Sequence, residues 1–343
     1  MKQIKTICAA FLVSMAAVAA ASLTARPVHA EIVLKFATVD VPQAQDNIEV
    51  LHPWADKINK EAHGLFSIQL YDGGAIANQS NVYDQVVNDV VQIAWGLPAA
   101  AAGKFRLLQV AESPFVASGD SEIDSVALWR LYKSGLLDKE FDQVVPLQLI
   151  IFPTTSLYFR QKPQTLEDLK GLKIIALSRT QSVFLTKLGA APISFRLDEA
   201  YVALQRSAAD GIATAWPAFQ PFKLGDVTHS YVEAPLGSGD GYIFMARKQW
   251  NALPEGVQKI LAENSGEAAS RAFGKFWNRV AQEGREATLK RPGYTQLHLT
   301  AAQAEDWHNR LAPVADEWAK SVPGGDKVLA SYRQFISDAK AGK

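Results

Sequence analysis

The chain has 343 residues, and its 35 Lys and Arg residues balance 35 Asp and Glu residues. No long basic run occurs and aromatic residues are not interleaved with Lys and Arg, so the composition argues against a nucleic-acid partner. A chain of this length can bury a large core and form two lobes. The single cysteine, Cys8, lies near the N-terminus, which excludes a disulfide framework in the rest of the chain.

The first thirty residues have the pattern of an export signal. Lys2 and Lys5 form a basic start that precedes an apolar run at 7–21. The sequence VHA at 28–30 fits a small-residue cleavage motif. A membrane anchor is the alternative, but the run is shorter than the ~20 apolar residues that a spanning helix needs. We therefore predict cleavage before Glu31 and a periplasmic product whose acidic residues exceed its basic residues by three.

The segment that follows alternates strands and helices. Runs of β-branched and aromatic residues predict strands, and apolar side chains spaced three and four apart predict helices. The predicted strands are 32–38, 65–71 and 91–95, and the helices between them are 50–63 and 82–90. A polar loop at 39–45 follows the first strand. The apolar run 147–152 is predicted as a buried strand that crosses between lobes.

Residues 165–211 predict a second α/β unit. A buried strand at 173–177 precedes a polar loop at 178–182 and a helix at 182–188, and a further strand follows at 212–216. Open α/β sheets bind ligands beyond the carboxyl ends of their strands, which is where the loop at 178–182 lies.

The longest predicted element lies between Pro254 and Pro292. Its apolar residues form one stripe, and an unbroken helix of this length would be roughly 55 Å long. Because this exceeds the width of one lobe, we expect the helix to brace both lobes. Gly266, Gly274 and Gly284 allow kinks within it.

The unit at 165–211 also closely resembles the central signature of the solute-binding proteins of TRAP (tripartite ATP-independent periplasmic) transporters, the DctP-like family. The shared parts are Leu-Glu-Asp-Leu-Lys-Gly at 166–171, Leu-Gly-Ala at 188–190, Pro192 with Phe195, Glu-x-Tyr-x-Ala-Leu-Gln at 199–205, and Asp-Gly at 210–211. The resemblance extends over nearly the whole chain after the predicted signal.

The resemblance implies an α/β fold of the two-lobe periplasmic-binding-protein type, with mixed sheets flanked by helices and a long helix spanning both lobes. We expect residues 31–152 and 243–281 to form lobe I, and residues 153–242 and 282–343 to form lobe II. The resemblance further implies that a monomer captures a small organic acid in the cleft between the lobes. It would deliver that acid to TRAP membrane permease subunits driven by an ion gradient.

Nothing in the sequence predicts an enzyme, a metal site or a cofactor site. The five histidines outside the predicted signal form no pair with metal-ligand spacing, and no cysteine is present to complete one. No G-x-S-x-G or Walker-type loop occurs. The glycine-rich sequence GSGDG at 237–241 does not open a predicted helix, so a turn is favoured over a phosphate-binding loop.

The chain departs from the family pattern at the usual ligand-binding arginine. Members usually pair that arginine with a ligand carboxylate where this chain has Ile175, and usually have an asparagine where it has Thr214. Arg179 is the strongest substitute, because an anion beside it would also meet a helix N-terminus. The alternative is an exposed arginine without a contact. Arg160 is the next candidate, with a hinge or inter-lobe ion pair as the favoured alternative.

The other predicted cleft residues are mostly aromatic or carry a hydroxyl group, and core burial is the alternative for each ring. The full set of predicted ligand-binding residues is Arg179, Trp95, Phe195, Thr214, Trp216, Thr155, Ser178, Phe219 and Tyr158. Together with the missing arginine, this set favours an aromatic or otherwise bulky organic acid over a sugar acid or a small dicarboxylate. Three alternatives stay open: a neutral solute, presentation of the ligand to a membrane sensor kinase, and an enzyme on the same fold.

Overall fold

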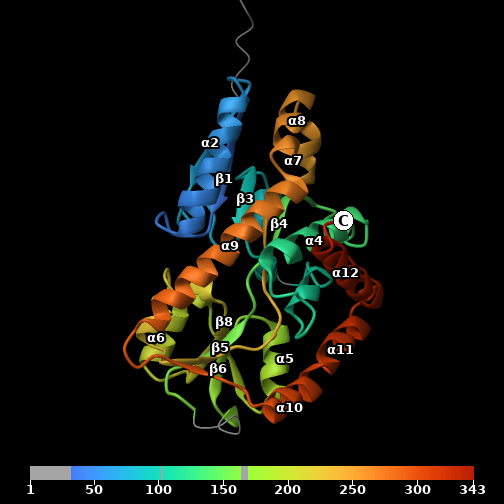
Figure 1. The fold of residues 1–343 in the computed structure, drawn as a ribbon. Coiled ribbons are helices and arrows are strands. Elements are labelled where there is room, and N and C mark those ends of the chain that lie inside the picture. Colours follow the sequence, from blue (N-terminus) through green and yellow to red (C-terminus); the bar gives the residue numbers. More distant parts are fainter. Residues whose placement is uncertain (1–31, 102, 164–168) are drawn as a thin grey trace, which may run out of the picture.

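The computed structural model describes residues 32–101, 103–163 and 169–343, which form two sheets with helices around each (Figure 1). This confirms the predicted α/β class with mixed sheets. The predicted export signal and the Glu-Asp pair at 167–168 of the TRAP-like segment lie outside the described residues. None of the described helices is long and apolar enough to cross a membrane.

Sheet A is the centre of lobe I and has five strands in the order β2-β1-β3-β10-β4. β1 pairs in parallel with β2 and β3, whereas β10 runs antiparallel between β3 and β4. The strands are β1 (Ile32–Thr38), β2 (Phe66–Tyr71), β3 (Ile93–Gly96), β4 (Val144–Ile151) and β10 (Asp240–Ala246). Because β10 comes late in the sequence, the chain leaves lobe I after β4 and returns to it.

The two faces of sheet A enter two different hydrophobic clusters, because successive side chains of a strand point to opposite faces. Phe36 and Trp95 enter one cluster together with α2 (His52–Glu61). Ala37 and Ala94 enter the other, which contains side chains from the helices on the opposite face. Those helices are α3 (Val82–Val87), α4 (Ser121–Lys133) and α12 (Gly325–Lys340).

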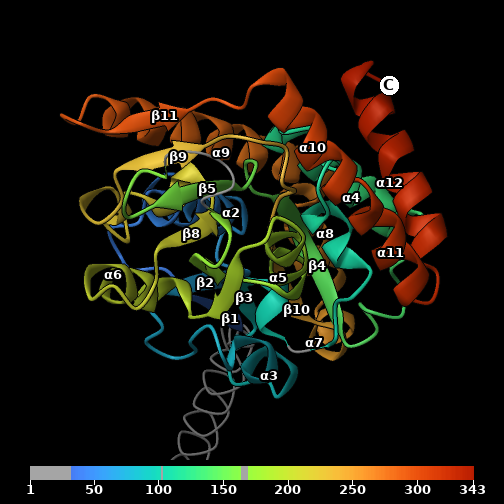
Figure 2. The same cartoon turned by 90° about the horizontal axis from the view of Figure 1, so that it is seen from below.

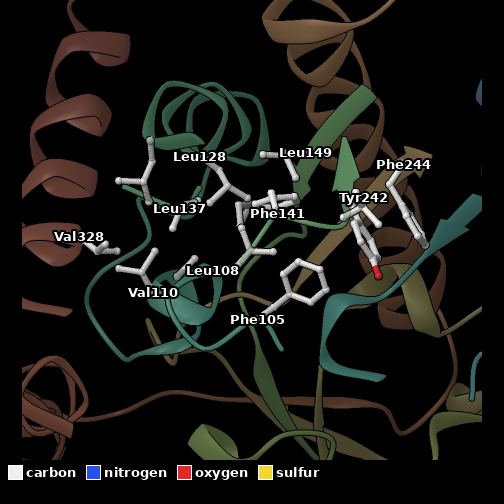
Figure 3. Packing of buried hydrophobic residues seen from close by; sticks show 14 of the residues in the cluster. Phe105, Leu108, Val110, Leu128, Leu137, Phe141, Leu149, Tyr242, Phe244 and Val328 are labelled. Carbon is white, nitrogen blue, oxygen red and sulfur yellow. The ribbon is translucent and has the colours of Figure 1, made fainter. Parts of the chain in front are cut away.

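Figure 3 shows this second cluster, in which aromatic and aliphatic side chains from distant parts of the chain interlock. Phe105 contacts both Phe141 and Tyr242 edge-on or tilted, with ring centroids 5.2 and 5.4 Å apart. Val328 reaches the same cluster from α12. Each fully buried side chain of this size contributes about 1.5–3 kcal/mol, so this cluster accounts for much of the stability of lobe I.

Sheet B is the centre of lobe II and has six strands in the order β11-β9-β5-β8-β6-β7. β6 pairs in parallel with β7 and β8, and β5 runs antiparallel between β8 and β9. The strands are β5 (Ser156–Phe159), β6 (Lys173–Ala176), β7 (Ala191–Ser194), β8 (Gly211–Thr214), β9 (Ser230–Val232) and β11 (Thr295–Leu297). Helices α5 (Arg179–Lys187) and α6 (Ala200–Gln205) pack beside them.

The long helix predicted between Pro254 and Pro292 is present but broken into two, α8 (Glu255–Glu263) and α9 (Gly266–Leu289). The short helix α7 (Arg247–Ala252) precedes Pro254. The break before α9 falls at Gly266, whose φ of +85° suits glycine and few other residues. α9 continues through Gly274 and Gly284 for 24 residues, about 36 Å. It contributes Phe273 and Trp277 to the lobe I core, while Leu289 packs in lobe II, so α9 alone braces both lobes.

The last three helices return the chain from lobe II to lobe I along one side of the molecule (Figures 1 and 2). α10 (Ala301–Leu311) packs in the core of lobe II, α11 (Pro313–Ser321) contacts both cores, and α12 packs in the core of lobe I. We expected residues 282–343 to belong to lobe II. This holds for α10, whereas α12 packs in lobe I. The other lobe boundaries stay a prediction.

Substitution of Gly274 by alanine tests the close approach of α9 to α4 in lobe I. A Cβ there would lie 2.3 Å from the Ser121 carbonyl oxygen, so α9 and α4 would have to separate. We expect Gly274→Ala to lower the free energy of unfolding by at least ~2 kcal/mol in urea denaturation. Gly256→Ala, where only the Leu65 side chain is near at 3.3 Å, should change it by less than ~1 kcal/mol. Equal effects of the two substitutions would contradict this role of Gly274.

Candidate functional site

Two extended segments cross between the lobes and are held side by side by backbone hydrogen bonds. The Phe152 amide donates to the Gly239 carbonyl (2.9 Å), and the Thr155 amide donates to the Gly237 carbonyl (2.8 Å). The second segment also bonds to the chain before α4, since the Ser238 amide donates to the Ala111 carbonyl (2.8 Å). Because these segments connect β4 to β5 and lead into β10, they mark the boundary between the lobes and bring ends of strands from both sheets to it.

α9 forms a continuous wall along this boundary. In lobe I, Trp277 packs edge-on against Phe152, which in turn contacts Trp95, with centroid distances of 5.2 and 6.2 Å. In lobe II, a Cβ at Gly284 would lie 3.2 Å from the Trp216 carbonyl oxygen. Trp277 and Gly284 are two turns apart on α9, about 10 Å. α9 therefore runs from the surroundings of Trp95 in lobe I to Trp216 in lobe II.

Trp95 is a core residue whose polar atom is already occupied. It is 1% exposed, and its ring lies 5.0 Å from that of Phe273. The indole Nε1 donates to Asp40 Oδ2 at 2.5 Å. Burial raises the pKa of Asp40, and burial together with the Asp40 carboxyl raises the pKa of Asp46 well above its usual range. The segment after β1 thus places two buried carboxyl groups, those of Asp40 and Asp46, at the boundary beside Trp95.

Lobe II contributes an aromatic cluster at the same boundary. Tyr158 contacts Trp216, Phe219 and Tyr231 with centroid distances of 4.9, 4.5 and 5.8 Å. Ile175 is fully buried in this cluster, on the strand next to β8. The position at which the resemblance implies an arginine is therefore buried in a cluster that contains these rings, and it lacks a charge.

Two polar atoms of the cluster lack a partner of normal hydrogen-bond geometry within the described residues: Tyr158 Oη and Trp216 Nε1. Burial raises the pKa of Tyr158 well above its usual range, so its hydroxyl stays protonated, although the nearby Ser156 hydroxyl opposes this shift. Both groups can donate a hydrogen bond, and a buried donor without an acceptor costs about 1–3 kcal/mol. The pair is therefore suited to an acceptor supplied by a ligand.

The carboxyl ends of β6 and β8 place several predicted residues beside these donors, because the two strands are parallel neighbours. Thr214 ends β8 and pairs across the sheet with Ser156. Ser178 caps α5 by accepting from the Gln181 amide (3.2 Å). Arg179 is exposed and pairs with no described acid. The predicted loop at 178–182 is wrong, since these residues are the cap and first turn of α5.

The other predicted residues lie around this edge. Thr155 is buried on the crossing segment, and Phe195 is half-buried against the aromatic cluster. Arg160 lies 4.0 Å from Asp210. Both of these residues belong to lobe II, so the expected hinge or inter-lobe pair of Arg160 is wrong. Its Nε atom is buried without a partner among the described residues.

Sequence reasoning missed Glu112 and Asp240, which are both buried at the boundary. Burial raises the pKa of Glu112 to about 7, opposed by hydrogen bonding to Ser178 and Thr180 of α5. Burial and the Glu112 carboxyl raise the pKa of Asp240 well above its usual range. Across the described residues, no three His, Cys, Asp or Glu side chains are arranged to hold a metal ion.

Comparison with known proteins identifies what the chain resembles. The family model for bacterial extracellular solute-binding proteins, family 7 (DctP), matches residues 36–321. The outer membrane transporter protein TsaT of Comamonas testosteroni is 26% identical, with 86% of this chain and 89% of TsaT covered. The C4-dicarboxylate-binding periplasmic protein DctP of Rhodobacter capsulatus is 30% identical, but only 50% of this chain and 51% of DctP are covered.

The solved structure of a TRAP solute-binding protein from Rhodoferax ferrireducens, in complex with copurified benzoate, superposes with a TM-score of 0.84. It is 27% identical to this chain, and 91% of this chain and 99% of that protein are covered. The match therefore includes both lobes and the boundary between them.

Removal of the Tyr158 hydroxyl tests whether this group is unpaired in the protein without ligand. We expect Tyr158→Phe to leave the free energy of unfolding unchanged or to raise it by up to ~1 kcal/mol, because a buried polar group without a strong partner is removed. Urea denaturation of the ligand-free protein measures this. As a control, Tyr231→Phe should be destabilising, because Tyr231 Oη accepts from Arg285 at 3.1 Å. A large loss of stability in Tyr158→Phe would show that its hydroxyl has a partner.

Proposed function

The chain belongs to family 7 of the bacterial extracellular solute-binding proteins, and we propose that it captures an aromatic or similarly bulky monocarboxylate between its lobes. Proteins of this family bind and transport solutes. We further propose that the chain has no enzymatic activity, is exported by a cleaved signal to the periplasm, and acts as a monomer. It would deliver its ligand to TRAP membrane permease subunits.

The observation that carries the proposed ligand class is the environment of Ile175. An arginine at this position would offer a fixed charge, whereas Ile175 adds apolar surface to a cluster of aromatic rings. The donors that remain nearby are Tyr158 Oη and Trp216 Nε1, which are neutral. One carboxylate can accept from both donors, while an aromatic body would pack on the surrounding rings.

Arg179 provides the positive charge that attracts such an anion. It lies in the first turn of α5, where the helix dipole adds to its field, and it is free of ion pairs with described residues. A small dicarboxylate would need a second anchor, and the acidic groups Asp40 and Asp46 occupy the lobe I side instead.

The relatives support the same class of ligand. The structural relative with copurified benzoate is similar over 91% of this chain. The C4-dicarboxylate-binding relative is similar over only half of it. Of these two relatives, the one with benzoate is similar over both lobes, which supports an aromatic acid as the proposed ligand.

A thermal-shift screen of residues 31–343 tests the proposed ligand class. We expect benzoate to raise the melting temperature, and benzamide and succinate to have little effect at the same concentration. A ligand at a hundred times its dissociation constant stabilises the folded state by about 2.7 kcal/mol. Equal shifts with benzoate and benzamide would indicate a neutral solute. A shift with succinate alone would contradict the aromatic ligand.

Variants locate the carboxylate anchor if benzoate binds. We expect Tyr158→Phe to weaken binding about tenfold or more, since a hydrogen bond to a charged group is worth about 1.5–3 kcal/mol. Arg179→Met should also weaken it, and the loss should shrink at high salt. Arg333→Met on α12 is the control, because Arg333 is exposed and lies on the lobe I side. Calorimetric titration measures all three, and unchanged affinity in Tyr158→Phe and Arg179→Met would place the anchor elsewhere.

A further inference from the structure

Glu112 and Asp240 come from different parts of lobe I and meet at the lobe boundary. Glu112 ends the short 3₁₀ helix Leu108–Glu112, and Asp240 begins β10; they are 6% and 4% exposed. The segment that leads into Asp240 lies close to the backbone of Glu112, since a Cβ at Gly237 would lie 2.1 Å from the Glu112 carbonyl oxygen and the Ser238 amide donates to the Ala111 carbonyl (2.8 Å). Gly237 also has a φ of +86°, so this approach requires glycine.

The alternation of β10 directs the Asp240 side chain toward the segment that carries Glu112. The glycines at 239 and 241 lie against the rings of Phe152 and Trp95. Because strand side chains alternate, Asp240 points to the opposite face, which is the face of Tyr242. Leu108 and Val110 belong to the hydrophobic cluster of Tyr242 on that face, and Figure 3 shows Phe105 between Leu108 and Tyr242.

Glu112 also reaches across to lobe II. The hydroxyl groups of Ser178 and Thr180, at the N-terminus of α5, lie close enough to its carboxyl group to oppose the rise of its pKa. This is the helix terminus where we expected an anion to bind from the sequence. In the structure, a carboxyl group of the protein itself lies there.

The surroundings of this pair contain unpaired oxygens and further acids. Glu112 Oε2, Asp240 Oδ2, Ser113 Oγ and Ser238 Oγ are buried and have no hydrogen-bond partner within the described residues. The titratable groups that act on Asp240, or on which it acts, are Glu112, Glu140, Tyr242 and Tyr332.

No Lys, Arg or His side chain among the described residues forms an ion pair with Glu112 or Asp240. Arg179, the only charged residue in the first turn of α5, is exposed. Two buried carboxyl groups with acidic neighbours cannot both be ionised at low cost.

We propose that Glu112 and Asp240 form a proton-binding site at the lobe boundary, and that the proton held there joins the segment 108–112 of lobe I to α5 of lobe II. A protonated carboxyl removes the repulsion between the pair and supplies a donor for one of the unpaired oxygens. The contact with α5 then closes without a buried negative charge.

The site makes stability depend on pH with a definite sign. Burial raises the pKa of Glu112 from 4.5 to about 7. Below pH 4.5 the group is protonated in folded and unfolded chains alike. As the pH rises from 4.5 through 7, the unfolded chain loses the proton first, so the folded state is progressively destabilised.

Melting temperatures of the ligand-free protein between pH 5 and 8 test the site. We expect Glu112→Gln to melt close to wild type at pH 5 and clearly higher than wild type at pH 8. Asp240→Asn should likewise gain stability relative to wild type as the pH rises above 3.8, because burial raises the pKa of Asp240 from that value. Burial also raises the pKa of Asp124, to about 6. Because Asp124 is present in the wild type and in every variant, its effect cancels when their melting temperatures are subtracted. Glu255→Gln on the exposed face of α8 is the matched control and should keep the wild-type profile. A difference between Glu112→Gln and wild type that is constant with pH would overturn the proton site.

Thr180→Val tests the connection to α5. This substitution keeps the side-chain shape and removes a hydroxyl group that stabilises the charged form of Glu112. The midpoint of the pH profile should therefore move to higher pH, and an unmoved midpoint would overturn the connection between lobes.

Infrared spectroscopy provides a readout that does not depend on melting. At pH 6.5 the wild-type protein should show protonated-carboxyl C=O intensity that Glu112→Gln lacks, and equal intensity in the two proteins would contradict a proton bound at Glu112. Because no ligand is present in any of these experiments, their failure would leave the proposed ligand capture untouched.

Discussion

The packing of α9 in two hydrophobic cores at once is the constraint on which the other features depend. Phe273 and Trp277 belong to the core of lobe I, while Leu289 packs in lobe II. Gly274 lets the helix lie against the backbone of α4, and Gly284 lets it lie against the backbone at Trp216. Because one rigid helix serves both lobes, the strand ends of sheets A and B are held facing each other across a fixed wall.

The proposed ligand class depends on which hydrogen-bond donors at the lobe boundary have no acceptor. Trp95 has given its N–H to Asp40, whereas Tyr158 and Trp216 keep unused donors in an apolar environment. Lobe I adds carboxyl groups, and lobe II adds donors and the exposed charge of Arg179. In the proposed complex, this polarity would orient an aromatic acid with its carboxylate toward sheet B. The same reasoning assigns a proton to Glu112 and Asp240, because no cationic side chain pairs with them in the described residues.

Residue patterns predicted the alternation of strands and helices well, because burial imposes a period of two or 3.6 on the sequence. The helix start at 182 was wrong although a signal was present: Ser178 and Gln181 have capping spacing, and Ser178 does cap α5. The break at Gly266 depends on a positive φ that the sequence allowed but did not require. Of the predicted site residues, Tyr158, Trp216, Phe219 and Phe195 share a hydrophobic cluster with Ile175, and their contact with a ligand stays a prediction. The pairing of Glu112 with Asp240 could not be predicted, because it joins residues 128 positions apart through tertiary contacts alone.

A crystal structure of the mature protein with benzoate tests the central claim most directly. The account predicts a benzoate ring against the Tyr158–Trp216–Phe219 cluster, with carboxylate oxygens within hydrogen-bond distance of Tyr158 Oη and Trp216 Nε1. Benzoate bound outside the lobe boundary, or bound there with its carboxylate directed to lobe I and those two donors still unpaired, would contradict it.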